Sequence, residues 1–122
     1  MPILMQRTPR PTHSPWGPVN EADEIMNGMW RVYTPEHGGI ILSSQRVQLV
    51  PFIYLQSTFD RQGWDGFFEE DCDMAIPLLV FEFEYRQYLS NTGASFDQIN
   101  EFMQLISQEV HRLVSNQHQL VL

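Results

Sequence analysis

The chain has 122 residues, of which 43% are hydrophobic, and a formal net charge of −8 at pH 7. This length fits one domain with its own hydrophobic core. The chain has no apolar run of about 18 residues, so no helix that crosses a membrane is predicted. The acidic excess repels nucleic-acid phosphates and argues against direct binding of DNA or RNA. Cys72 is the single cysteine, so no intrachain disulfide can form, and we expect a cytoplasmic protein.

The N-terminal segment, residues 1–15, is predicted to be a flexible arm, because four prolines interrupt it and large apolar side chains are sparse. The same prolines break the apolar core that a secretory leader needs. A single α+β domain is expected over residues 16–122. Near its start, Asn20 resembles a helix N-cap followed by acidic residues, so one helical turn is predicted over residues 20–26.

A β-hairpin is predicted over residues 28–42, where side chains typical of strands flank a turn. Gly38 and Gly39 are assigned to this turn, because glycine permits positive φ angles. The hairpin supplies the sheet of the predicted domain.

Three segments of different character follow the hairpin. Ser43 or Ser44 can cap a short helix over residues 45–49. Residues 57–68 are loop-like. The apolar stretch at residues 74–88 fits both a helix, from its apolar stripe, and a strand, from its alternation, and the helix is favoured.

The last predicted element is a long amphipathic helix. Ser95 and Gln98 match a capping box, and apolar residues recur at helical spacing from Phe96 to about residue 115. The predicted fold class is therefore α+β: a small antiparallel hairpin or sheet packed against a long C-terminal helix and one or two further helices.

Most of the negative charge lies within residues 60–84, which hold eight acidic residues and a single basic one, Arg61. Such a concentration attracts a basic protein surface, including one that normally binds nucleic acid. Aromatic side chains beside the acids would supply binding energy. The predicted partner-binding residues are Asp60, Trp64, Asp65, Phe67, Glu69, Glu70, Asp71 and Asp73.

A binding role is favoured over a catalytic one. If the protein were an enzyme, His37, Cys72 and Asp71 would be the candidates for thiol chemistry. The acids on both sides of Cys72 disfavour its thiolate, which makes it a poor nucleophile. The sequence has no strong metal-ligand spacing and no cofactor motif, so neither a metal nor a cofactor is expected.

Two segments resemble motifs of a known family. TPEHGGIILS (34–43) is similar to a TPSHGGI.LS motif, and GWDGFFEEDCDMA (63–75) is similar to GWYEEDCDWA. Both motifs belong to a domain of unknown function found in integrative elements, plasmids and phages, often near antirestriction genes. Met74 replaces that family's usual tryptophan, and two residues are inserted near Asp65. Residues 28–34 are also locally similar to ArdB/KlcA-type antirestriction proteins.

The resemblance implies a mobile genetic element in a bacterial host. Together with the charge, it predicts a small protein-binding protein that inhibits a host defence system, by antirestriction or anti-CRISPR action, through occupation of a basic nucleic-acid-binding surface. Two alternatives stay open. One is a small Cys/His or metal-dependent hydrolase that uses His37 and the acids of residues 69–73. The other is a structural accessory protein that dimerises through its C-terminal helix.

Overall fold

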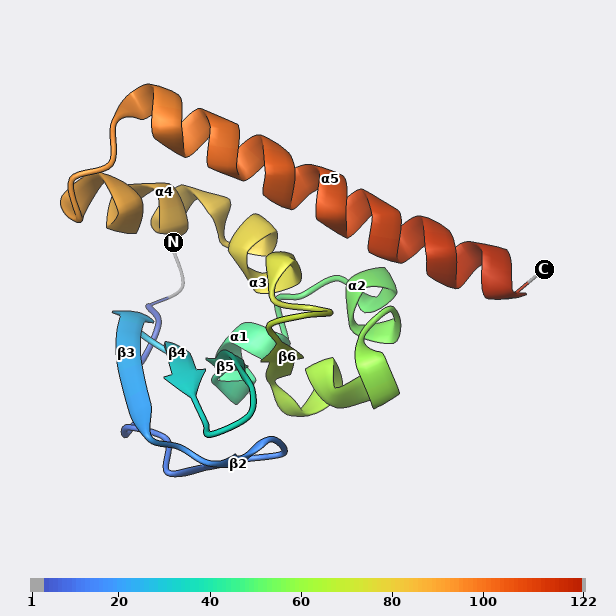
Figure 1. The fold of residues 1–122 in the computed structure, drawn as a ribbon, viewed down its shortest axis with the longest axis horizontal. Helices are drawn as coiled ribbons and strands as arrows, with labels where there is room; N and C mark the ends of the chain where they lie inside the picture. The colour runs from blue at the N-terminus through green and yellow to red at the C-terminus, as the bar shows by residue number, and fades with distance from the viewer. Residues whose placement is uncertain (1–3, 122) are drawn as a thin grey trace.

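The computed structural model describes residues 4–121, with side chains up to residue 116. Four antiparallel strands form a sheet in the order β3 (Glu21–Met26), β4 (Met29–Tyr33), β5 (Gly38–Leu42) and β6 (Phe67–Glu69). A two-stranded ribbon joins β1 (His13–Ser14) to β2 (Gly17–Pro18). Figure 1 shows the sheet on one side of the molecule and the long helix α5 (Phe96–Val121) running across the other.

The β4–β5 pair confirms the predicted hairpin. Its turn is closed by a 2.8 Å hydrogen bond from the Thr34 N–H to the His37 carbonyl oxygen. Across the sheet, Val32 and Ile40 are buried, so the hairpin contributes directly to the core.

The assignment of Gly38 and Gly39 to the turn is wrong, because both lie in β5 and neither has a positive φ. Glycine is required here for space. A Cβ on Gly39 would lie 2.4 Å from the Phe68 carbonyl oxygen and 2.5 Å from the Trp16 ring. The absence of a side chain therefore lets β6 and the Trp16 indole approach β5 closely.

Residues 21–26 form a strand, so the helical turn predicted over residues 20–26 is wrong. β3 pairs with β4, and Ala22 lies opposite Val32. Without β3, the outer backbone groups of β4 would lack partners, and this long-range requirement outweighs the local N-cap signal. Asn27 and Gly28 form the connecting turn, with Gly28 at a φ of 80°. An Asn-Gly pair is a strong hairpin signal, and it identifies β3 in the sequence.

Short helical elements connect β5 to β6, and some of them lie where a loop was predicted. α1 (Ser44–Val47) is capped by Ser43, whose Oγ accepts from the Arg46 N–H at 3.2 Å, in agreement with the prediction. α2 (Phe52–Gln56) then leads into the 3-10 helix η1 (Phe59–Asp65) and β6, so residues 57–68 are not an irregular loop.

The helical interpretation of residues 74–88 is confirmed, and the strand alternative is wrong. The segment forms α3 (Ala75–Val80) and α4 (Glu82–Asn91). The two helices meet at Phe81, whose φ of −104° and ψ of 39° break the helix. Phe81 is buried at this break and packs against the core.

α5 covers the other helices and confirms the α+β class. Ser95 and Gln98 form both bonds of the predicted capping box, at 2.8 and 3.1 Å. The helix continues to Val121, beyond the predicted end near residue 115. Its buried face consists of Ile99, Met103, Ile106 and Val110. Between residues 4 and 121, no helix is both long and apolar enough to cross a membrane.

The N-terminal segment, predicted to be a flexible arm, is hydrogen-bonded to the sheet in its described part. The indole Nε1 of Trp30 donates to Thr8 Oγ1 at 3.0 Å, and Arg7 forms an ion pair with Glu24 at 2.6 Å. These contacts attach the segment to β3 and β4, and its mobility in solution stays a prediction.

Candidate functional site

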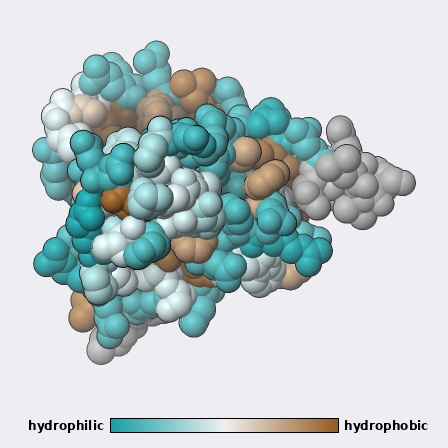
Figure 2. Space-filling view, turned by 60° about the horizontal axis from the view of Figure 1, so that its bottom comes forward, coloured by the Kyte–Doolittle hydropathy of each residue, from teal (hydrophilic) through white to brown (hydrophobic). Residues whose placement is uncertain are grey.

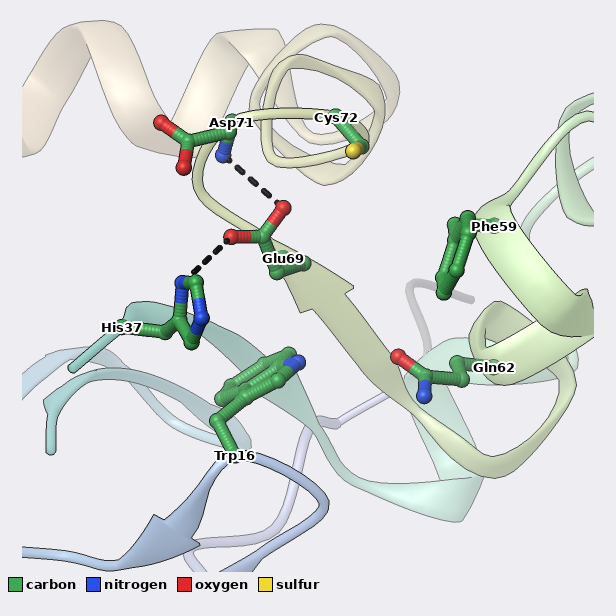
Figure 3. A pocket seen from close by; sticks show the side chains of 7 residues that line it. All are labelled: Trp16, His37, Phe59, Gln62, Glu69, Asp71 and Cys72. Atoms are coloured by element: carbon green, nitrogen blue, oxygen red, sulfur yellow. Dashed lines mark hydrogen bonds and ion pairs between the residues drawn. The ribbon is translucent and has the colours of Figure 1, made fainter.

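The two motifs noted in the sequence meet at one end of the sheet. β5 and β6 pair with Gly39 opposite Glu69, and the Glu70 N–H extends the pairing by donating to the Gly38 carbonyl oxygen at 2.9 Å. His37 precedes β5 and Glu69 ends β6. The strand pairing therefore places the imidazole beside the carboxylate, as Figure 3 shows.

A pocket of about 370 Å³ opens beside these two side chains. Small-ligand sites have volumes of roughly 300–1,000 Å³. In Figure 3 the His37 imidazole lies between the Trp16 indole and the Glu69 carboxylate, and side chains of η1 face them. The lining residues are Trp16, His37, Phe59, Gln62, Glu69, Asp71 and Cys72.

One oxygen of the Glu69 carboxylate has a backbone donor, and the other has none among the described residues. The residue is 9% exposed, and its Oε2 accepts from the Asp71 N–H at 3.1 Å. Its Oε1 lies 3.5 Å from His37 Nδ1, is shielded from solvent and has no hydrogen-bond partner among the described residues. His37 is positioned independently, because the Thr34 hydroxyl bonds to its backbone at 2.7 and 3.1 Å. The site thus contains a buried acceptor atom that lacks a donor.

Cys72 lines the same pocket but is a poor nucleophile. Burial is the main factor that raises the pKa of its thiol to about 11, followed by the hydrogen bond and charge of Glu69 and the charges of Asp73 and Asp71. The thiol is therefore protonated at neutral pH. Within residues 4–116, no hydrogen bond joins Cys72 to His37. The neighbouring acids considered in the sequence are thus a real but smaller cause than burial.

The acids of residues 60–84 do not form one exposed patch. Glu69 and Asp73 are buried, so these two predicted partner-binding residues are not available to a rigid partner. Three others are paired with arginine: Glu70 with Arg31, Glu82 with Arg86, and Glu84 with Arg46. Asp60, Asp65 and Asp71 are exposed, and no ion pair involves them in the described part of the chain.

Large apolar side chains are exposed on α2, on η1 and at Leu49, just after α1, and η1 contacts both α1 and α2. Phe52 is 64% and Trp64 44% exposed, and their rings meet edge to face at 5.4 Å. Figure 2 shows small hydrophobic areas within a largely hydrophilic face of the molecule. We define the aromatic–acidic surface as Leu49, Phe52, Ile53, Phe59, Asp60, Trp64 and Asp65.

Sequence reasoning identified only part of this surface. Trp64 was predicted, whereas Phe52 and Phe59 were missed, because nothing local distinguishes an exposed phenylalanine from a core one. Phe67, also predicted, is half-buried and packs edge-on against Trp16 at 6.1 Å. Exposed apolar residues also occur on α4 and α5, namely Phe83, Phe96 and Leu105. Dimerisation through α5 stays a prediction.

The buried carboxylate of Asp73 should make the stability of the protein depend on pH. The carboxylate is buried and accepts from the Phe59 N–H at 2.9 Å, and burial is the main factor that raises its pKa from 3.8 to about 6. Because the pKa is raised in the folded state, the stability that protonated Asp73 contributes to the protein is complete below about pH 4 and is lost as the pH rises through 6. We expect Asp73→Asn to raise the free energy of unfolding at pH 7 by up to about 3 kcal/mol.

Urea denaturation between pH 4 and 7 measures this effect. Asp73→Asn should flatten the pH dependence, whereas Asp65→Asn, at an exposed position, should leave it unchanged. A variant that is less stable than the wild type at pH 7 would show that the bond to Phe59 outweighs the cost of burying the charge.

Comparison with known proteins identifies a family but no activity. No curated protein and no solved structure matches the chain. A family model described as a domain of unknown function, DUF7007, matches residues 9–118 and so includes the described site. With nearly the whole chain matched, this protein belongs to the DUF7007 family.

Proposed function

We propose that this protein is a non-enzymatic protein-binding protein of a phage or another mobile element, and that it acts in the cytoplasm of a bacterial host. It inhibits a host defence system, of the restriction or CRISPR type, by occupying a basic nucleic-acid-binding surface. The exposed Phe52–Trp64 pair, with the exposed Asp60 and Asp65 on the same 3-10 helix as Trp64, is the observation that carries this proposal.

The physical support lies in the composition of the aromatic–acidic surface. Exposed aromatic rings gain about 2 kcal/mol or more when they are buried at the centre of a protein interface. Carboxylates beside them steer a basic partner toward the rings and oppose acidic ones. The net charge of −8 extends this attraction to the whole domain. A partner with a basic groove is therefore favoured over an acidic or neutral one.

The mobile-element context rests on the sequence motifs. The resemblance of TPEHGGIILS and GWDGFFEEDCDMA to motifs found near antirestriction genes supports a target in host defence. The second motif contains Trp64 and Asp65, which belong to the aromatic–acidic surface. The same motif therefore supplies both the family resemblance and part of the proposed contact.

Affinity capture from a host lysate tests the electrostatic part of the proposal. We expect the full chain to recover a basic, nucleic-acid-binding protein at low salt and to lose it at high salt, since salt screens exposed charges. Asp60→Asn with Asp65→Asn should weaken capture. A matched control replaces Asp97 and Glu101, exposed acids on α5, by Asn and Gln. Equal capture by both double variants would contradict a role for the aromatic–acidic surface.

A hydrolase is the second candidate, favoured by the proximity of His37 and Glu69 in one pocket with Asp71 and Cys72. The raised thiol pKa argues against its thiol form. If the pocket were catalytic, His37→Ala would abolish an activity of the protein without changing its thermal stability, because the side chain of His37 is half exposed.

A further inference from the structure

We propose that His37, Glu69 and Asp71 form a binding site for a divalent first-row transition-metal ion, with Glu70 as a fourth ligand. None of these four residues belongs to the aromatic–acidic surface, and Phe59 is the residue of that surface that also lines the adjoining pocket. The sequence offered these residues only as an open alternative, since the histidine and the acids lie more than 30 residues apart and their spacing matches no metal motif.

The ligand atoms already converge. One ligand atom from each of the four residues lies within 4.8 Å of all the others. Nitrogen and oxygen ligands bind such ions at about 2.0–2.2 Å, which places neighbouring ligand atoms roughly 3–4 Å apart. The remaining adjustment is small, and three of the four side chains, those of His37, Glu70 and Asp71, are exposed enough to make it.

The decisive observation is the unpartnered oxygen of Glu69. A buried carboxylate oxygen without a hydrogen bond is costly, and native proteins satisfy such atoms with a donor, a water or an ion. Glu69 Oε1 is closed to solvent and points at His37 Nδ1 from 3.5 Å, too far for a good hydrogen bond. An ion between the two groups would bind both of them and give the buried Glu69 oxygen the partner that it lacks.

The charges around the site also favour a cation. Three carboxylates crowd together here, and in the described part of the chain Arg31 is the one arginine paired with them, through its 3.0 Å contact with Glu70 Oε2. That pairing leaves the other oxygen of Glu70 free to turn toward the ion. A divalent cation would relieve the mutual repulsion of Glu69 and Asp71, which have no ion pair with arginine in the described residues.

The donor set selects the kind of ion. Carboxylates alone suit Mg²⁺ or Ca²⁺, whereas an imidazole nitrogen shifts the preference toward Zn²⁺, Mn²⁺ and related ions. The adjoining pocket leaves room for water or a small ligand on the ion. Trp16 and Gln62 line this pocket, and each has a buried atom, Nε1 and Oε1, with no hydrogen-bond partner among the described residues that such a ligand could satisfy.

Isothermal titration of the full chain with Zn²⁺ or Mn²⁺ alone tests the site. We expect one ion per chain, and affinity at least about tenfold weaker in both His37→Ala and Glu69→Gln. His111→Ala, at an exposed histidine on α5, serves as the control and should bind as the wild type does, and Cys72→Ser tests whether the thiol takes part. The ion should also raise the melting temperature of the wild type but not of His37→Ala.

The outcomes separate the alternatives. No binding by the wild type would overturn the metal site and leave a simple contact between His37 and Glu69. Binding that survives in Glu69→Gln but is lost in Cys72→Ser would move the ion to the thiol and also contradict the proposed ligand set. Circular dichroism of each metal-free variant identifies any loss of binding that results from misfolding, and the His37 variant, altered at an exposed side chain, gives the decisive comparison.

Discussion

Replacing Arg46 by alanine is expected to lower the free energy of unfolding by about 3–5 kcal/mol. Arg46 is fully buried, and its guanidinium donates hydrogen bonds to two different parts of the fold. Its Nε donates to the Asn27 carbonyl oxygen at 2.6 Å, and its two terminal nitrogens donate to Glu84 at 3.0 and 2.8 Å. It also lies 4.6 Å from the centre of the Phe81 ring. Arg46 therefore joins the β3–β4 turn, α1 and α4.

Alanine would leave a cavity and an Asn27 carbonyl without its donor. Glu84 is partly exposed and can return to water, so most of the loss should come from packing and from the Asn27 bond. Urea denaturation provides the measurement, with Arg86→Ala as the control. Arg86 is half-buried, pairs with Glu82 four residues away on the same helix and donates to Asn100 Oδ1 at 2.8 Å, so its loss should cost only about 1–2 kcal/mol. Equal effects of the two variants would contradict this account of Arg46.

Replacing Trp64 by alanine is expected to weaken binding of the captured partner by about 2 kcal/mol or more, which is about 30-fold in Kd. The side chain presents its ring to solvent beside Phe52 and contributes little to the core. Its removal should change the free energy of unfolding by less than about 1 kcal/mol. The expected signature is a large loss of affinity without a matching loss of stability.

Phe83→Ala is the matched control, because Phe83 is 87% exposed and lies on α4, away from the aromatic–acidic surface. Surface plasmon resonance with the purified partner compares the two variants with the wild type. If Phe83→Ala weakens binding as much as Trp64→Ala, the contact is not centred on η1, and the proposed surface is wrong.

The parts of the fold that were predictable are those set by neighbouring residues. The capping box of Ser95 and Gln98 and the apolar periodicity of α5 are local signals, and both hold in the structure. The helix at residues 74–88 was ambiguous, because Pro77 fits a strand start and also occupies the first turn of α3. Packing of α3 against α5 resolves the ambiguity, and no local pattern reports that contact.

The missed strand β3 has a different cause. Its residues have acidic side chains that suit a helix start, and only pairing with β4 makes the extended form favourable. The Asn27-Gly28 pair was visible in the sequence and would have corrected the prediction.

The candidate site was predictable as residues but not as geometry. Both motifs that contain His37 and Glu69 stand out in the sequence, yet they meet only because β5 and β6 pair across more than 20 intervening residues. The sequence also could not separate exposed from buried acids. Asp71 and Asp73 are two positions apart, but one is exposed and the other is buried under η1.

Competition with nucleic acid tests the central claim most directly. Labelled DNA or RNA is bound to the purified partner, and the full chain is added while fluorescence anisotropy is followed. If the protein occupies the basic nucleic-acid-binding surface, it should displace the labelled strand completely, and Trp64→Ala should require about 30-fold more protein. A stable ternary complex, in which partner, nucleic acid and this protein are bound together, would contradict the proposed function.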